Sequence, residues 1–196
     1  NLLDDCSRLH LQTRIYQSEN LLAHLDLLPS AFTVYGLPLE IYVDYHSIFF
    51  SSTGVTQLQE ALHFYGVSFR YAPTPQAKGK IERDHQVWQA RLPSFFASEA
   101  VGDLAQANSA IEALRLHRNA HQLHRELEMT PKAAWDSALA ENRSALRPVP
   151  NCPWWPFVWS LRSALQVQRD RRLVVANHSF RVDAAPGSWL ILCNHP

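Results

Sequence analysis

The sequence predicts an α/β domain followed by a small β-rich domain. Strand-like and helix-like segments alternate through residues 1–141, which is typical of an α/β fold. A segment rich in Pro and Trp then interrupts the pattern at 142–160. From residue 161 onward, apolar residues recur at every second position, which is typical of β-strands. The composition of the 196 residues, 46% hydrophobic and 18% charged, is that of a globular protein.

Strands and helices are expected to alternate up to residue 71. Ser18 is a residue type that caps helix starts, and Gly36 is a type that ends helices. Gly66 ends a second segment in which apolar residues recur at helical spacing. β-branched and aromatic residues favour strands around these helices. The expected strands cover residues 9–16, 39–43 and 67–71, and the expected helices cover residues 18–35 and 54–65.

Three more helices are expected before residue 141. The first runs from Lys78 to about residue 96, and Pro93 is expected to kink it. Asp103 has the side chain to cap the second helix, which should reach His121. Thr130 opens the third helix, because the proline that follows it suits the first helical position.

Four prolines between residues 148 and 156 exclude a long helix or a central strand there. We therefore expect a linker over 142–160, with its tryptophans packed on the core or on a partner subunit rather than stacked on bases. The alternating segments of 161–196 predict a small antiparallel sheet or barrel. Its expected strands are 165–168, 172–175, 179–182 and 189–192.

Composition excludes several classes of protein. Lys plus Arg and Asp plus Glu each number 18, so bulk positive charge cannot hold this chain on nucleic acid, although a local basic patch can. Three widely spaced cysteines argue against a disulfide framework or a zinc ribbon. No apolar run approaches the ~20 residues that span a bilayer. The chain starts without Met, and we expect it to be a fragment of a longer protein.

Two carboxylates stand at positions that suit catalysis. Asp44 follows the expected strand at 39–43, and ligands bind at the carboxyl ends of strands in α/β sheets. Glu82 lies in the first turns of the helix that begins near Lys78. A turn aspartate and a glutamate favoured by the helix dipole are the simpler interpretations of each residue alone.

The order of the segments around these carboxylates resembles the integrase core of bacterial insertion-sequence transposases and retroviral integrases. In that family a strand ends in Asp and leads through a Ser- and Phe-containing turn, a helix and a short strand. A Pro-containing loop and a helix bearing Glu follow. The matching pieces are Asp44, Ser47, Phe49, Gly66-Val67, Pro73, Pro75, residues 76–79 and residues 81–83.

The resemblance extends to both sides of this segment. Residues 2–8 are similar to the family's second strand, and residues 117–131 are similar to its closing helices. The segment QAKGKIER is most similar to the corresponding segment of insertion-sequence transposases. The resemblance implies a ribonuclease-H-like integrase core at 1–141 that lacks its first strand. It also implies a linker at 142–160 and a truncated C-terminal β-barrel-like domain at 161–196.

The family uses three carboxylates, and its first lies on a strand that would precede residue 1. Asp4 and Asp5 are too close in sequence to Asp44 to replace it. The resemblance implies that Asp44 and Glu82 are catalytic and bind Mg²⁺ or Mn²⁺. Hard carboxylate oxygens suit these ions, which activate the attacking oxygen and stabilise the leaving oxygen in phosphodiester transfer.

The implied function is that of a DDE-type DNA transposase, which hydrolyses phosphodiesters at element ends and transfers strands into target DNA. This fragment alone is expected to be inactive, because its first Asp would be missing. Lys78, Lys80, Arg83 and Gln86 on the Glu-bearing helix would contact DNA, and an ordinary solvated face is the simpler interpretation. The implied partners are DNA and further copies of the chain, and no membrane is implied. The implied location is the bacterial cytoplasm, in association with the nucleoid.

Three alternatives remain open. An inactive integrase-like module could bind only DNA or a protein partner, a different ribonuclease-H-like nuclease could share the core, and an unrelated α/β domain could carry the motif by coincidence. Histidines 117, 121 and 124 follow a helical spacing that could hold zinc. A helix face packed on the core explains these histidines more simply, because no fourth ligand is evident nearby.

Overall fold

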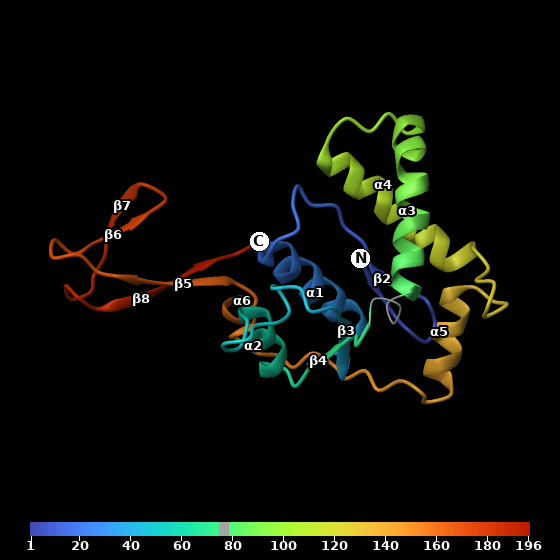
Figure 1. Ribbon diagram of the computed structural model, residues 1–196, viewed down its shortest axis with the longest axis horizontal. Coiled ribbons are helices and arrows are strands. Elements are labelled where there is room, and N and C mark those ends of the chain that lie inside the picture. The colour runs from blue at the N-terminus through green and yellow to red at the C-terminus, as the bar shows by residue number, and fades with distance from the viewer. Residues whose placement is uncertain (75–78) are drawn as a thin grey trace.

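The computed structural model describes residues 1–74 and 79–196, and only the backbone of Lys80. Six helices and eight strands are defined there, and Figure 1 shows their arrangement. The strands are β1 (Leu2–Leu3), β2 (His10–Gln12), β3 (Glu40–Val43), β4 (Ser68–Tyr71), β5 (Leu161–Gln166), β6 (Arg172–Val175), β7 (His178–Arg181) and β8 (Trp189–Asn194). The helices are α1 (Leu21–Tyr35), α2 (Gln57–Phe64), α3 (Gly79–Ser98), α4 (Leu104–His121), α5 (Pro131–Ala140) and α6 (Trp155–Val158).

The body of the molecule is mixed α/β, as the sequence predicts. Strands β1 and β2 form an antiparallel pair, and β3 and β4 form a parallel pair. Within the described residues these pairs are separate two-stranded sheets. The parallel register runs from Glu40 opposite Ser68 to Val43 opposite Tyr71. Parallel strands need a crossover, and α2 supplies it between β3 and β4.

The core lies between α1, α2 and the C-terminal end of the 142–160 segment. Phe32 of α1 and Leu58 and Leu62 of α2 are at most 2% exposed. Trp159 packs edge-on against Phe32 and stacks with Tyr65. Full burial of an aliphatic side chain contributes about 1.5–3 kcal/mol, so this cluster is a main source of stability.

Local chemistry sets the ends of α1. The helix begins at Leu21, because Oδ1 of Asn20 accepts a hydrogen bond from the backbone N–H of Ala23 at 2.9 Å. The expected cap, Ser18, is wrong by two residues; its Oγ instead accepts a hydrogen bond from Nδ2 of Asn20. Gly36 ends the helix with a φ of 91°, which glycine adopts without a steric penalty.

The other helix starts follow the sequence closely. Thr56 caps α2 in a reciprocal capping box with Gln59. Asp103 caps α4, and Thr130 caps α5 with Pro131 at its first position, so both predictions are confirmed. Within the described ranges, no helix combines the length and apolarity needed to cross a bilayer.

The Pro- and Trp-rich segment packs partly on the body. It forms the short helix α6, and Trp155 and Trp159 contact the ring of Tyr65 at centroid distances of 5.1 and 6.1 Å. Trp154 is 60% exposed and does not join this cluster. Packing of the segment on the core is therefore confirmed for two of its three tryptophans.

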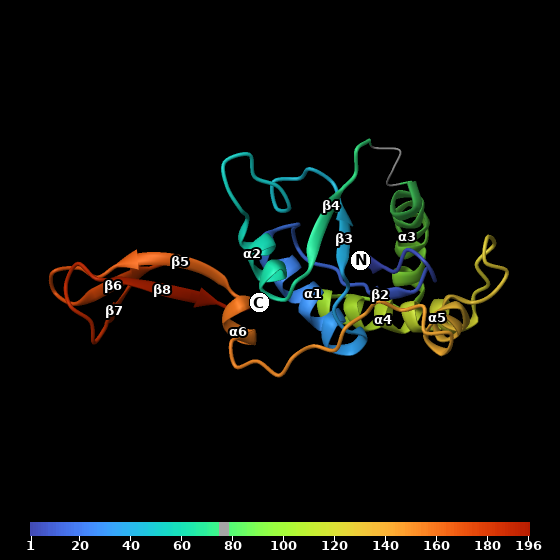
Figure 2. The ribbon, with the colours of Figure 1, turned by 90° about the horizontal axis from the view of Figure 1, so that it is seen from below.

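Residues 161–196 form two two-stranded sheets that extend away from the body in both views (Figures 1 and 2). Strand β5 pairs only with β8, and β6 pairs only with β7, all antiparallel. A barrel requires every strand to have two paired neighbours. The predicted antiparallel pairing is therefore confirmed, whereas residues 161–196 show no closed barrel, because alternating apolar positions fix the strands but not their closure.

Candidate active site

Asp44 lies directly after β3, at the carboxyl end of the parallel pair. The backbone N–H of Ala72 donates to the carbonyl of Val43 at 2.8 Å, which continues the strand pairing up to the residue before Asp44. Oδ1 of Asp44 accepts a hydrogen bond from the backbone N–H of His46 at 3.1 Å. This Asx-type turn fixes the chain as it leaves the strand, and the Asp44 side chain remains partly exposed.

An aromatic cluster supports the turn that follows Asp44. The ring of Tyr45 stacks on Tyr71 of β4 with centroids 5.0 Å apart. Oη of Tyr71 donates to the carbonyl of Phe49 at 2.7 Å and accepts from Nε2 of Gln59 at 2.8 Å. Burial raises the pKa of Tyr71, so the phenol stays protonated and able to donate. Nothing in the sequence pattern predicts this supporting role of Tyr71.

Glu82 lies in the first turn of α3, and its side chain is exposed. Gln86 is also exposed and lies four residues further on, so the two side chains share one face of the helix. Figure 2 shows the carboxyl ends of β3 and β4 directed toward the side of the body where α3 begins. Asp44 follows β3 and Glu82 lies in the first turn of α3, so the two carboxylates come from different elements.

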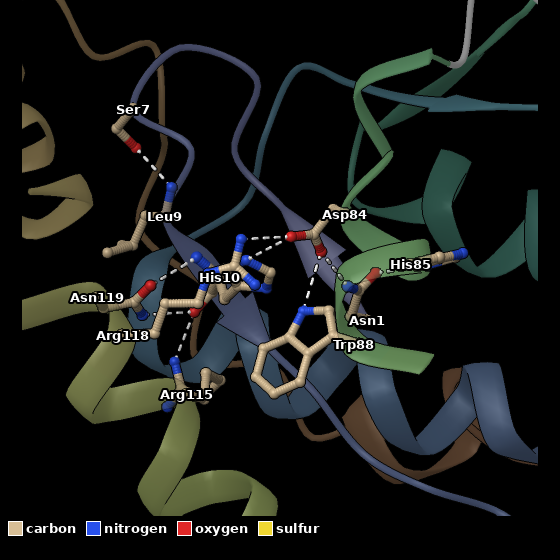
Figure 3. A network of polar contacts seen from close by, with 10 residues as sticks. All are labelled: Asn1, Ser7, Leu9, His10, Asp84, His85, Trp88, Arg115, Arg118 and Asn119. Carbon is tan, nitrogen blue, oxygen red and sulfur yellow. Dashed lines mark hydrogen bonds and ion pairs between the residues drawn. The ribbon is translucent and has the colours of Figure 1, made fainter. Parts of the chain in front are cut away.

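A buried polar network centred on Asp84 anchors α3 two residues beyond Glu82 (Figure 3). Oδ1 of Asp84 accepts from Nη2 of Arg118 at 2.7 Å and lies 3.2 Å from Nε2 of His10. Oδ2 accepts from Nε1 of Trp88 at 3.1 Å and from Nδ2 of Asn1 at 2.8 Å. The carboxylate therefore joins α3 to β2, to α4 and to the first residue of the chain.

Electrostatics keep this carboxylate ionised. Burial alone would raise the pKa of Asp84, but the hydrogen bond from His10 and the charge of Arg118 outweigh it and hold that pKa below its usual value. Burial also lowers the pKa of His10, whose side chain is 1% exposed. The stable state is thus a neutral imidazole beside an aspartate that is paired with a permanent guanidinium charge.

Helix α4 holds β2 by its own side chains. Oδ1 of Asn119 accepts from the backbone N–H of His10, and Nδ2 of Asn119 donates to the carbonyl of His10, both at 3.0 Å. Nη1 of Arg115 donates to the same carbonyl at 2.6 Å. Sequence reasoning recognised residues 117–119 as a motif without assigning roles, and it missed Asp84. The only sign of Asp84 in the sequence is an acidic residue two positions after Glu82, and such a residue is indistinguishable there from an ordinary solvated charge.

The predicted DNA-contacting residues are only partly described. Lys78 lies outside the described residues, as does the side chain of Lys80. Arg83 is 79% exposed and lies 3.7 Å from Oε1 of Glu126. Gln86 is exposed on the neighbouring face of α3. Arg83 and Gln86 are therefore both accessible to a ligand that lies along this helix.

Metal-ligating side chains do not form a cluster of three in the part of the chain that the structure describes. There, no three side chains of His, Cys, Asp or Glu form a group that could hold a metal ion. His117 and His121 lie ring to ring at 5.0 Å on α4, and the zinc interpretation finds no support in these ranges. Asp44 and Glu82 offer hard carboxylate oxygens, the donor type that Mg²⁺ prefers, and Mg²⁺ often takes its remaining ligands from water.

Comparisons with known proteins identify similar transposases. No family model matches the chain. It is 28% identical over 116 residues to the transposase for insertion sequence IS1202 of Streptococcus pneumoniae, covering 55% of this chain and 25% of that protein. It is 26% identical over 145 residues to a protein of Sinorhizobium fredii provisionally named transposase y4bF, covering 66% of this chain and 32% of that protein. The chain thus matches a quarter to a third of the length of these relatives.

The fold is similar to that of a chain in the cryo-electron microscopy structure of the simian T-cell lymphotropic virus intasome in complex with PP2A regulatory subunit B56 gamma. The TM-score is 0.53 at 17% sequence identity, covering 78% of this chain and 50% of that chain. At this identity the likeness concerns the fold. Together with the two relatives, it supports the resemblance expected from the sequence.

Proposed function

We propose that this chain is the catalytic-core part of a DNA transposase of the integrase type. The observation that carries the proposal is the placement of Asp44 at the carboxyl end of β3 and of Glu82 in the first turn of α3, in a chain similar to two transposases. The proposal includes the finer assignments to a ribonuclease-H-like core, a DDE-type reaction and action as a multimer on DNA.

The proposed chemistry is phosphodiester hydrolysis at element ends followed by transfer of the freed 3′-hydroxyl to a target phosphate. Asp44 and Glu82 would hold Mg²⁺ or Mn²⁺, which supplies Lewis-acid activation of the reacting oxygens when bound. The Asx turn at His46 orients the Asp44 carboxylate, and the Asp84 network holds the helix that carries Glu82. A third carboxylate would come from outside residues 1–196, so we propose that these residues alone are inactive.

The DNA strand would approach along the exposed side of α3. Arg83 can neutralise a backbone phosphate, and the amide of Gln86 can donate to phosphate or sugar oxygens. Lys78 and Lys80 belong to the same proposed set by their position in the sequence. These contacts position the substrate and carry no base specificity of their own.

The test uses the longer protein and DNA that carries the ends of its own element. We expect Asp44→Asn and Glu82→Gln each to lower Mg²⁺-dependent 3′-end cleavage and strand transfer by at least about 100-fold, because loss of residues that only support metal ligands already costs about 10–100-fold. Glu99→Gln, which changes another exposed glutamate of the same region, is the matched control. The products are resolved on sequencing gels. Full activity of the Glu82→Gln variant would refute the assignment of Glu82 as a catalytic residue.

A module that binds DNA or a partner without catalysis is the second candidate. The observation that favours it is that no three His, Cys, Asp or Glu side chains of the described residues form a group that could hold a metal ion. In that case the longer wild-type protein would bind element-end DNA but give no cleavage product with either Mg²⁺ or Mn²⁺.

A further inference from the structure

A cavity of about 380 Å³ lies between α3, α4 and the loop that follows α4. Its volume falls in the range of about 300–1,000 Å³ that is usual for small-ligand sites. Only two carboxylates, Asp84 and Glu126, line it among the described residues. The lining arginines come from four separate parts of the chain and are Arg8, Arg83, Arg91, Arg118 and Arg125.

Arg8 is a partly buried charge whose contacts with carboxylates are long. Its side chain is 14% exposed, and its nearest carboxylate oxygens belong to Asp5 at 3.4 Å and Glu126 at 3.9 Å. Charge-assisted hydrogen bonds from a guanidinium have lengths of about 2.7–2.9 Å. The contacts of Arg8 with Asp5 and Glu126 are longer than this, so its guanidinium has donors available for an anion in the cavity.

The outer arginines also keep their donors available. Arg83 lies 3.7 Å from Glu126, beyond hydrogen-bond length, and Arg91 and Arg125 form no ion pair with any carboxylate of the described ranges. Arg118 alone is committed, through its 2.7 Å bond to Asp84. Nδ1 of His124, which also lines the cavity, is buried and has no hydrogen-bond partner. The cavity therefore has an excess of unused donors and positive charge.

We propose that this arginine-lined cavity binds a phosphodiester group of DNA. The planar guanidinium fork matches two phosphate oxygens, and several forks around one cavity can share a single phosphate. A phosphate accepts hydrogen bonds through its oxygens, so it would satisfy Arg8 and the outer arginines at once. DNA as the source of the phosphate rests on the proposed function.

The cavity lies on a different stripe of α3 from Glu82. Arg83, Val87 and Arg91 line it at four-residue intervals, whereas Glu82 and Gln86 occupy the neighbouring stripe and do not line it. The phosphate in the cavity is therefore not the reacting one. It would fix a flanking part of the DNA strand and so set how the duplex lies across α3.

The test measures DNA affinity of the 196-residue chain as a function of salt, using a fluorescein-labelled duplex of about 20 base pairs. We expect Arg91→Gln combined with Arg125→Gln to weaken binding and to flatten the slope of log K against log salt by about 0.9, the value for one lost phosphate contact. Arg70→Gln combined with Arg143→Gln removes the same charge from two exposed arginines outside the cavity and should leave the slope unchanged.

The outcomes separate this proposal from the proposed function. Failure of the wild-type chain to bind the duplex would count against a DNA-binding role altogether. Binding by the wild type with equal slopes in the cavity variant and its control would overturn the cavity site alone. Calorimetry with inorganic phosphate distinguishes the source of the phosphate group. If the wild type gives a heat of phosphate binding that the cavity variant lacks, while both have the same salt slope for DNA, the cavity binds a free anion and the DNA assignment is overturned. The single variant Arg125→Gln serves if the double variant unfolds.

Discussion

Asp84 of α3, which is buried, and Arg118 of α4, which is partly buried, form an ion pair with Oδ1 of Asp84 2.7 Å from Nη2 of Arg118. Arg118 also lies over the ring of Trp88, 5.3 Å from its centroid, so the guanidinium is held on two sides. Because Glu82 lies only two residues before Asp84, this contact determines where the helix presents its proposed metal ligand.

Replacement of Asp84 by the equally sized Asn should therefore destabilise the protein, although it changes no packing. Asp84→Asn keeps the size of the side chain but leaves the charge of Arg118 without its buried partner. Loss of one member of a buried pair costs roughly 3–5 kcal/mol. Urea unfolding followed by circular dichroism measures this loss.

The matched control is Asp136→Asn, which breaks the exposed ion pair between Lys132 and Asp136. Exposed pairs contribute about 0–1 kcal/mol, so this variant should unfold near the wild type. Equal effects of the two substitutions would show that Asp84 does not have a buried structural role.

The tryptophans of the 142–160 segment should differ sharply in their effect on stability. Trp159 is 3% exposed and contacts Phe32 and Tyr65, so Trp159→Ala should lower the free energy of unfolding by roughly 3–5 kcal/mol. Trp154 is 60% exposed, and Trp154→Ala should change it by no more than about 0.5 kcal/mol. Guanidinium unfolding monitored by far-UV circular dichroism makes the comparison, and a mild Trp159→Ala effect would contradict the packing.

Gly36 should not tolerate a side chain. Its φ is 91°, and an added Cβ would lie 2.7 Å from the carbonyl oxygen of Arg147, which is backbone and cannot rotate away. Gly36→Ala should therefore cost roughly 1–3 kcal/mol. Gly54 has open space around it, so Gly54→Ala should be neutral or slightly stabilising. Thermal unfolding of both variants tests this difference, and similar melting temperatures would refute it.

Stability should fall as the pH drops below about 6.5. Burial lowers the pKa of His10, His24 and His124 in the folded protein, so the unfolded chain takes up protons that the folded chain refuses. Stability is then lost as the pH falls from the unfolded pKa toward the folded one, by up to about 1.4 kcal/mol per proton and pH unit.

Urea unfolding at pH 7.5 and 5.5 measures this dependence. His24→Gln should reduce the difference between the two pH values, because it removes one of the buried groups. His178→Gln, at an exposed position, should leave that difference unchanged. A wild-type stability that does not change over this range would contradict the burial of these imidazoles in their neutral form.

The sequence predicts best what short-range chemistry decides. Asp103 and Thr130 cap their helices as expected, because a capping side chain bonds to a backbone N–H only three residues away. The start of α1 was missed by two residues, since both Ser18 and Asn20 are good caps and the sequence alone does not rank them. The predicted strands at 39–43 and 67–71 are confirmed for the same short-range reason, namely a dense run of β-branched and aromatic residues.

Long-range relationships could not be predicted. The predicted barrel is not confirmed: β5 pairs with β8 and β6 with β7, and the apolar periodicity of a strand does not encode which strands pair. The role of Asp84 depends on the approach of Arg118 and His10 from other elements. Two sets of roles stay predictions, because they depend on bound metal and DNA. They are the catalytic roles of Asp44 and Glu82 and the DNA contacts of Lys78, Lys80, Arg83 and Gln86.

The parallel pairing of β3 and β4 also sets an order of events during folding. The ribosome needs seconds to add the residues of α2 and β4 after β3 is complete. The pairing of β3 with β4 therefore cannot begin until seconds after β3 has been synthesised. The antiparallel hairpin of β6 and β7 can instead close within about 1–10 μs of its own completion. The carboxyl edge that carries Asp44 therefore forms by a slower, less local encounter than the hairpin does.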